Sequence, residues 1–339
     1  MKYILLLIVM LFSLLINSTT EKEPKEPFEE KSVAAVLKRL GDTSIKHYPN
    51  FSRKNVSVEN GKQLFHTGFS ASAKGWRSKK QSKHFVCTSC HNVEREDPDL
   101  SVVDPQAQLE YVHEKGLPFL QGTTMYGAIN RTQFYNGDYY KKYGDLVIKA
   151  RDNIYEAIQL CAVECAQGRK LKHWELESIL AYLWTLEFKF KDLQLSDSEK
   201  EQIQAAIDNE GSAEAAVELI KSKYLKGEPA TFITPPENRQ QGENYQGDPE
   251  NGKLVYDLSC KHCHENERYS FFQLDDAKTT FKFLKKHIPS YSRYSIYQVT
   301  RWGTSPVPGK GAYMPVYTEE KLSRRQLQDL RAYIEQEAE

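Results

Sequence analysis

The sequence predicts an all-α protein built from two similarly organised units. Apolar residues recur at helical spacing near the end of each unit, and the alternating pattern of half-buried strands is scarce. The chain has 339 residues, which is long enough for two domains. The same features occur twice in the same order: a helix carrying an aromatic residue, a cysteine motif, a loop-rich stretch and a closing amphipathic helix.

The N-terminus has the pattern of an export signal. Met1-Lys2 is followed by an apolar run from Tyr3 to Ile16, which is short for a membrane span. We assign residues 1–20 to a signal peptide, although the small-residue cleavage site is missing. An uncleaved segment would anchor the protein to the membrane, and membrane contact is expected only in that case. Residues 21–54 are expected to form a charged, solvated tether.

The first unit is expected at residues 55–190. A helix around Gly61 to Phe65 leads toward Cys87, and the closing helix carries apolar residues at i, i+3, i+4 and i+7 from Leu176 to Leu183. The first cysteine comes 26 positions after Gly61, against 8 positions after Gly252 in the second unit. The first unit thus holds an insertion of about 18 residues, whose basic residues are Lys74, Arg77, Lys79, Lys80 and Lys83. This insertion suits an anionic substrate or an acidic partner, or it is a solvated basic face.

Residues 191–244 are expected to be a helical spacer and linker. Ser196 to Glu210 and Ala213 to Leu225 have the character of two short helices, and a run rich in Pro, Gly, Asn and Gln follows. The second unit is expected at residues 245–339. Its closing helix carries Leu327, Leu330 and Ile334 on one face, behind a capping box at Ser323 and Gln326.

The two cysteine motifs predict covalent haem. Cys87-Thr88-Ser89-Cys90-His91 and Cys260-Lys261-His262-Cys263-His264 both have the C-x-x-C-H pattern of c-type haem attachment. In this pattern Cys87, Cys90, Cys260 and Cys263 bind two porphyrins through thioether bonds, and His91 and His264 bind the irons. The alternative is a pair of zinc knuckles, but a histidine directly after both cysteine pairs would then be coincidental. Because c-type haem is attached outside the cytoplasm, the motifs agree with an exported, periplasmic protein.

Met314 is the candidate distal ligand of the second haem. It is one of two methionines outside the signal segment, lies 50 residues after His264 and directly precedes Pro315 and the closing helix. Methionine is a common sixth ligand of haem iron. The alternative is that Met314 only fills a gap in the core.

The distal ligand of the first haem has competing candidates. Met125 lies only 34 residues after His91, far from the closing helix. Cys161 lies on an apolar helix face with Ile154, Ala157 and Ile158, and Cys165 follows one turn later. A helical i, i+4 pair is too widely spaced for a good disulfide, so we expect free thiols, with Arg169 favouring the thiolate.

Other possibilities for this iron are Cys165, an open site, or a histidine among His84, His113 and His173. Replacing Cys165 with alanine is expected to change little.

The layout resembles a tandem diheme cytochrome c with two class I domains, over residues 55–190 and 245–339. Methionine followed by proline before the closing helix is similar to the ligand loop of that class. Ile158-Gln159-Leu160-Cys161, Gly168-Arg169 and Trp174-Glu175 resemble the first domain of thiosulfate dehydrogenases and of diheme sulfur-oxidation cytochromes. This second resemblance implies that Cys161 is a thiolate ligand and, in an enzyme, the catalytic residue.

Three functions follow as hypotheses. The first is a periplasmic electron carrier with a low-potential first haem and a higher-potential second haem, exchanging electrons with redox proteins. The second is the oxidation of thiosulfate or a related sulfur anion, and the third is a diheme peroxidase, which would require an open iron. Lys plus Arg and Asp plus Glu both number 46, and this balance argues against nucleic acid as a partner.

Overall fold

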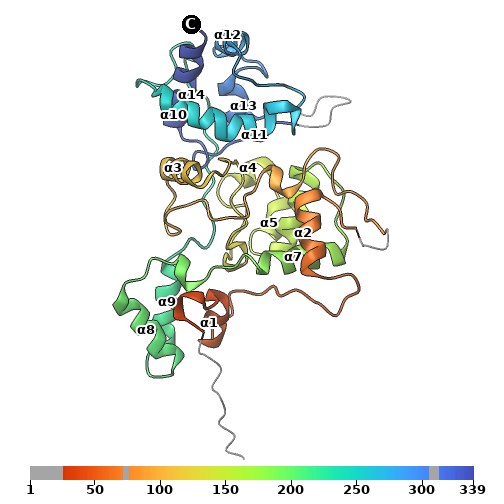
Figure 1. Ribbon diagram of the computed structural model, residues 1–339, viewed down its shortest axis with the longest axis vertical. Helices are drawn as coiled ribbons and strands as arrows, with labels where there is room; N and C mark the ends of the chain where they lie inside the picture. Colours follow the sequence, from red (N-terminus) through yellow and green to blue (C-terminus); the bar gives the residue numbers. More distant parts are fainter. Residues whose placement is uncertain (1–25, 72–75, 305–312) are drawn as a thin grey trace, which may run out of the picture.

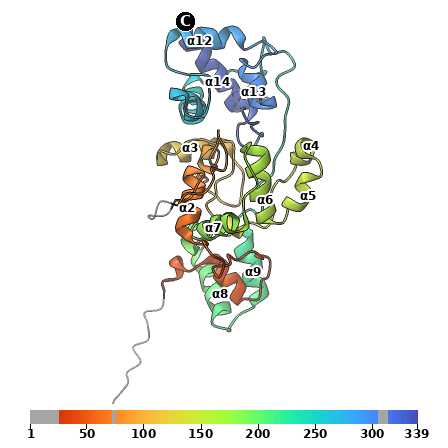
Figure 2. The ribbon, with the colours of Figure 1, turned by 90° about the vertical axis from the view of Figure 1, so that its right-hand side faces the viewer.

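The computed structural model describes residues 26–71, 76–304 and 313–339. Within these ranges the protein is helical, with two isolated bridges and no strand, which confirms the all-α prediction. The helices form three tiers along the longest axis of the molecule (Figures 1 and 2). The expected signal segment 1–20 and Lys74 of the insertion lie outside the described residues. No described helix has both the length and the apolar character that a membrane crossing requires.

The lower tier combines the end of the expected tether with the spacer. Its helices are α1 (Val33–Arg39), α8 (Asp197–Ile207) and α9 (Ala213–Ser222). The Ser32 side chain caps α1 by accepting a hydrogen bond from the Ala35 amide, and the inner face of α1 packs with α8 and α9 in one core. Part of the range 21–54 therefore belongs to the folded body, while α8 and α9 match the two expected spacer helices.

The middle tier surrounds the first cysteine motif. It contains the following helices: α2 (Val58–Thr67), α4 (Tyr139–Tyr143), α5 (Leu146–Ala150), α6 (Ile154–Leu160) and α7 (His173–Trp184). The expected closing helix is α7, and a π-helical turn, Cys161–Cys165, continues α6. A π-helical turn is rare and often marks a functional site.

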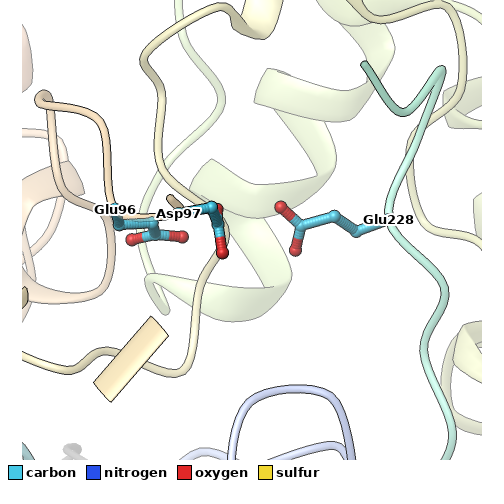
Figure 3. A group of neighbouring side chains, drawn as sticks. All are labelled: Glu96, Asp97 and Glu228. Atoms are coloured by element: carbon cyan, nitrogen blue, oxygen red, sulfur yellow. The ribbon is translucent and has the colours of Figure 1, made fainter. Parts of the chain in front are cut away.

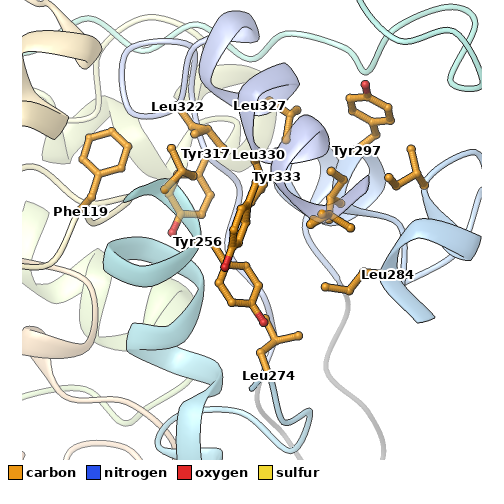
Figure 4. Packing of buried hydrophobic residues seen from close by; sticks show 14 of the residues in the cluster. Phe119, Tyr256, Leu274, Leu284, Tyr297, Tyr317, Leu322, Leu327, Leu330 and Tyr333 are labelled. Carbon is orange, nitrogen blue, oxygen red and sulfur yellow. The ribbon is translucent and has the colours of Figure 1, made fainter. Parts of the chain in front are cut away.

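The upper tier contains the second cysteine motif. Its helices are α10 (Pro249–Val255), α11 (Lys261–His264), α12 (Lys278–His287), α13 (Ile296–Trp302) and α14 (Arg324–Glu337). The capping box is present at the start of α14, where the Ser323 hydroxyl accepts from the Gln326 amide. Figure 4 shows Tyr256, Leu330 and Tyr333 of this core packed together.

Both motif-bearing tiers use the same helix crossing. A Cβ atom added to Gly61 of α2 would lie 1.8 Å from the carbonyl oxygen of Ser178 in α7. In the upper tier, a Cβ atom added to Gly252 of α10 would lie 2.0 Å from the carbonyl oxygen of Asp329 in α14. Only glycine permits backbones to approach this closely. The first and closing helices of each unit therefore cross in contact at a glycine, as the repeated sequence pattern suggests.

Helix α3 (Pro105–Lys115) joins the middle tier to the upper one. Leu109, Val112 and the following Phe119 are buried in the core of the upper tier, although they belong to the first unit in sequence. The Phe119 amide also donates to the Leu258 carbonyl at 3.0 Å. Shared core residues hold the two units in a fixed relation.

Candidate functional site

Backbone carbonyls hold the two histidines of the cysteine motifs in the same way. The Nδ1–H of His91 donates to the Thr123 carbonyl at 2.7 Å, and that of His264 donates to the Phe272 carbonyl at 2.7 Å. With Nδ1 protonated, Nε2 carries the lone pair. This backbone-held tautomer is the usual arrangement of metal-ligating histidines. Burial lowers the pKa of both imidazoles, which favours the neutral form that binds metal.

Gly122 leaves room for the His91 ring. A Cβ atom at this position would lie 2.6 Å from His91 Cε1 and 2.5 Å from the Cys90 carbonyl oxygen. The Gly122 amide donates to that carbonyl at 3.1 Å, so the segment runs directly along the motif. The close approach places Thr123 within hydrogen-bond reach of His91.

A mainly apolar cavity of about 1250 Å³, part of it open to solvent, lies at the second motif. Cys260, Cys263 and His264 line it together with Met314, so the structure brings these expected site residues to one space. The Met314 amide donates to the Thr304 hydroxyl at 2.8 Å, and the Thr304 amide donates to the Met314 carbonyl. These two bonds fix the backbone that carries the methionine.

The two motifs lie against each other. Cys90 of the first motif lines the same cavity as the second motif. The ring of His262 in the second motif lies beside the Thr88 and Ser89 backbone, and burial lowers its pKa to about 4. Phe85 and Tyr313 close the junction with an edge-to-face contact of 5.8 Å between ring centroids. Groups attached to the two motifs would therefore be neighbours.

Met125 lies on the His91 side of the first motif. Its amide donates to the Asn92 carbonyl at 2.8 Å, and it follows Thr123, which holds His91, by two residues. Its side chain packs in the apolar core of the middle tier. The Met125 backbone is thus tied to the segment that follows His91, and Cys87 packs against the same core as the Met125 side chain.

Cys161 and Cys165 are both free thiols, as expected, and they contact each other within the π-helical turn. Cys87 and Cys90 are close enough to Cys161 to act on it electrostatically. The hydrogen bond from Cys161 lowers the pKa of Cys165 to about 6 against the effect of burial, and the same bond raises the pKa of Cys161. Cys165 in turn acts electrostatically on Cys90, so both thiols of the turn lie near the attachment cysteines.

Two tyrosines that the sequence analysis did not single out surround Cys165. Its sulfur lies 3.5 Å from the Tyr143 hydroxyl and 3.6 Å from the Tyr135 hydroxyl. The only sequence signal for them is the tyrosine-rich run from Tyr135 to Tyr143. That run gives no indication that the hydroxyls turn toward a thiol more than twenty residues away.

The hydrogen bonds of Arg169, which the sequence analysis expected to favour a thiolate, go to groups other than the thiols. Its guanidinium binds both carboxylate oxygens of Glu175, at 2.6 and 2.8 Å, and donates to the Lys79 and Lys80 carbonyls. Arg169 instead ties the basic insertion to the start of α7. The side chains of Lys79, Lys80 and Lys83 are exposed.

A buried charge cluster lies behind His91. The Lys321 ammonium pairs with Glu96 at 2.9 Å and Glu228 at 3.1 Å, and the Thr123 hydroxyl donates to Glu228 at 2.6 Å. Figure 3 shows Asp97 and Glu228 pointing toward each other from two segments. Lys321 lies between two of these carboxylates and Arg131 pairs with Glu228 at 3.7 Å, so the chain itself supplies two cations to the cluster.

Asp97 gives the cluster a pH dependence. Burial raises the pKa of Asp97 to about 7 in the folded protein. Between the ordinary pKa of 3.8 and about pH 7, the folded state keeps a proton on Asp97 that the unfolded state has released. The free energy of unfolding therefore falls as the pH rises through this range. We expect Asp97→Asn to raise the unfolding free energy at pH 8 by on the order of 2–4 kcal/mol and to change it little at pH 4.

Denaturant unfolding at both pH values measures this effect. Asp99→Asn is the matched control, because the Ser101 hydroxyl holds the pKa of Asp99 below its ordinary value. That variant should lose stability at pH 8, which is the opposite sign, and should still lose it at pH 4, because the pKa of Asp99 lies below 3.8 and its carboxylate stays ionised at both pH values. Equal effects of Asp97→Asn at the two pH values would contradict the prediction.

Comparison of the chain with protein-family models, curated proteins and solved structures gave no match.

Proposed function

We propose that the chain is an exported diheme c-type cytochrome that transfers electrons between redox partners. The observation that carries the proposal is the placement of the two C-x-x-C-H motifs, which adjoin at one cavity and present histidines in the same metal-binding tautomer. The glycine crossing shared by the two units is consistent with a pair of cytochrome c domains at 55–190 and 245–339. Bound haems would supply one-electron oxidation and reduction.

The residues at the second motif fit a haem. The cavity is lined largely by aromatic and aliphatic side chains, as binding sites for large flat cofactors are. Burial raises the pKa of the Cys260 thiol to about 12 and that of Cys263 to about 11, so both are neutral thiols before attachment. Among the described residues, no three cysteine or histidine ligand atoms lie within 4.8 Å of one another, as a closed zinc site would require.

The chain supplies a distal ligand for each site. Met314 would bind the second iron, held in place by its two hydrogen bonds with Thr304. Cys161 would bind the first iron, since it lies near Cys87 and Cys90, whereas the backbone of Met125 is tied to Asn92 next to His91. A thiolate favours ferric iron more than a thioether does, so the first haem is assigned the lower potential.

Electrons would leave through the upper tier. Phe271 and Tyr294 line the cavity of the second motif and are 42% and 40% exposed, so the cavity reaches the surface. The adjoining motifs give a short route from the first site to this opening. The partners in this account are redox proteins, with membrane contact only through an uncleaved signal segment.

A second candidate function is the oxidation of thiosulfate or a related sulfur anion at the first site. The placement of Cys161 near the attachment cysteines favours it, and the exposed lysines of the insertion suit an anion. Steady-state turnover with thiosulfate separates it from a simple carrier.

Met314→Ala tests the ligand of the second site. We expect loss of the weak sulfur-to-iron absorption in the far red and a lower potential for the upper redox wave, because a thioether ligand raises the potential. Met125→Leu is the control and should leave that band and wave in place. An unchanged spectrum in Met314→Ala would refute the assignment.

A further inference from the structure

Cys165 contacts the proposed ligand Cys161. The two residues occupy the ends of the π-helical turn, in which the Ala166 amide donates to the Cys161 carbonyl five residues earlier at 2.8 Å. Their side chains are in hydrogen-bond contact. The turn thus keeps both sulfurs on one side of the helix, and both lie near the attachment cysteines.

Two phenol groups fix the position of Cys165. The Tyr143 hydroxyl of α4 lies 3.5 Å from its sulfur, and the Tyr135 hydroxyl of the preceding loop lies 3.6 Å from it. The Tyr135 hydroxyl is also 3.5 Å from the Ala157 carbonyl, so it bridges Cys165 to α6. Tyr135 has a φ of 50°, a left-handed conformation that is unfavourable for a bulky residue. Strain of this kind is kept where a side chain is needed in one place.

The rings around Cys165 support one another. Tyr135 packs edge-on against Tyr139 at 5.2 Å and against Tyr143 at 6.2 Å between ring centroids. Tyr139 in turn packs against Phe232 at 5.3 Å. Packing between the rings therefore holds the phenol hydroxyls in position.

We propose that Cys165 is a positioning residue that donates a hydrogen bond to the Cys161 sulfur and thereby tunes the first haem, with Tyr135 and Tyr143 holding it for this purpose. The proposal rests on the proposed ligation of haem by His91 and Cys161. It revises the expectation from the sequence that replacing Cys165 changes little.

A Cys161 sulfur that binds iron as a thiolate carries no proton, so in the proposed holoprotein Cys165 would become the donor of the hydrogen bond that Cys161 donates in the structure. A hydrogen bond to a thiolate ligand withdraws electron density from the sulfur and so reduces its donation to iron. Loss of that bond makes the thiolate a stronger donor and stabilises ferric iron. Removing Cys165 should therefore lower the potential of the first haem.

The test is a redox titration of the holoprotein combined with its ferric electron paramagnetic resonance spectrum. Cys165→Ala should move the lower wave to a lower potential, shift the thiolate-type signals and leave the upper wave fixed. Tyr135→Phe/Tyr143→Phe should move the lower wave in the same direction by less. Cys165→Ser, which keeps a donor, should restore most of the parent potential.

Tyr139→Phe is the matched control. Tyr139 belongs to the same ring cluster, but within the described part of the chain its hydroxyl makes no hydrogen bond to Cys165. If the potential shifts came only from looser packing of the tyrosine rings, Tyr139→Phe would shift the redox waves as well, and that result would overturn the proposal. Parent-like waves and spectra in both Cys165→Ala and the double tyrosine variant would also overturn it.

The variant Cys161→Met shows whether a negative result reflects failure of the proposed Cys161 ligation or only of the role of Cys165. Unchanged resonance signals in Cys161→Met would show that the ligation itself is wrong. Changed signals there, with parent-like signals in Cys165→Ala, would leave the ligation intact and refute only the role of Cys165.

Discussion

Lys321→Met is expected to destabilise the folded protein by about 3–5 kcal/mol, because it leaves the buried Glu96 carboxylate without its cation and leaves Glu228 with Arg131 alone, at 3.7 Å. Lys321 is 5% exposed and Glu96 is 1% exposed, so water cannot replace the lost pair. Lys321, Glu96 and Glu228 come from the upper tier, the middle tier and the linker between α9 and α10. Denaturant unfolding of the holoprotein measures the change.

The controls separate lost charge pairing from lost packing. Lys282→Met replaces an exposed lysine of the same tier and should change the unfolding free energy by less than about 0.5 kcal/mol. Adding Glu96→Gln to Lys321→Met removes the uncompensated Glu96 charge and should recover part of the stability. A loss below about 1 kcal/mol for Lys321→Met would show that the cluster does not bind the tiers together.

Cys161→Met is expected to raise the lower redox wave by on the order of 0.2 V and to leave the upper wave nearly fixed, since axial ligands alone move haem potentials over about 0.8 V. Replacement of a thiolate by a thioether removes a strong electron donor from the first iron. A titration that resolves two waves tests this, with Met125→Leu as the control. If neither wave moves, Met125 becomes the leading ligand and a simple electron carrier becomes the leading function.

The helices were predictable wherever a local pattern defines them. The spacing of Leu176, Ile179 and Leu183 predicts α7, and the pattern after Ser323 predicts α14. Helix α1 also had a signal, because Val33, Val36 and Leu37 share one face behind Ser32. The charged residues of the surrounding range obscured it.

The contacts between distant segments were not predictable. Leu109 and Phe119 belong to the first unit but are buried with the second, and Lys321 meets Glu96 across 225 positions of sequence. Helical periodicity says which face is apolar but not which partner covers it. The motif residues were recognisable because their chemistry depends on local spacing, whereas Tyr135 and Tyr143 reach Cys165 only through the tertiary fold.

Mass spectrometry of the mature protein, produced by export in a host that attaches c-type haem, tests the central claim most directly. We predict two covalent haems on the parent chain, and one on each of Cys87→Ser/Cys90→Ser and Cys260→Ser/Cys263→Ser, because in the proposed function each C-x-x-C-H motif binds its own porphyrin. A folded, haem-free protein that carries zinc at these cysteines would contradict the account.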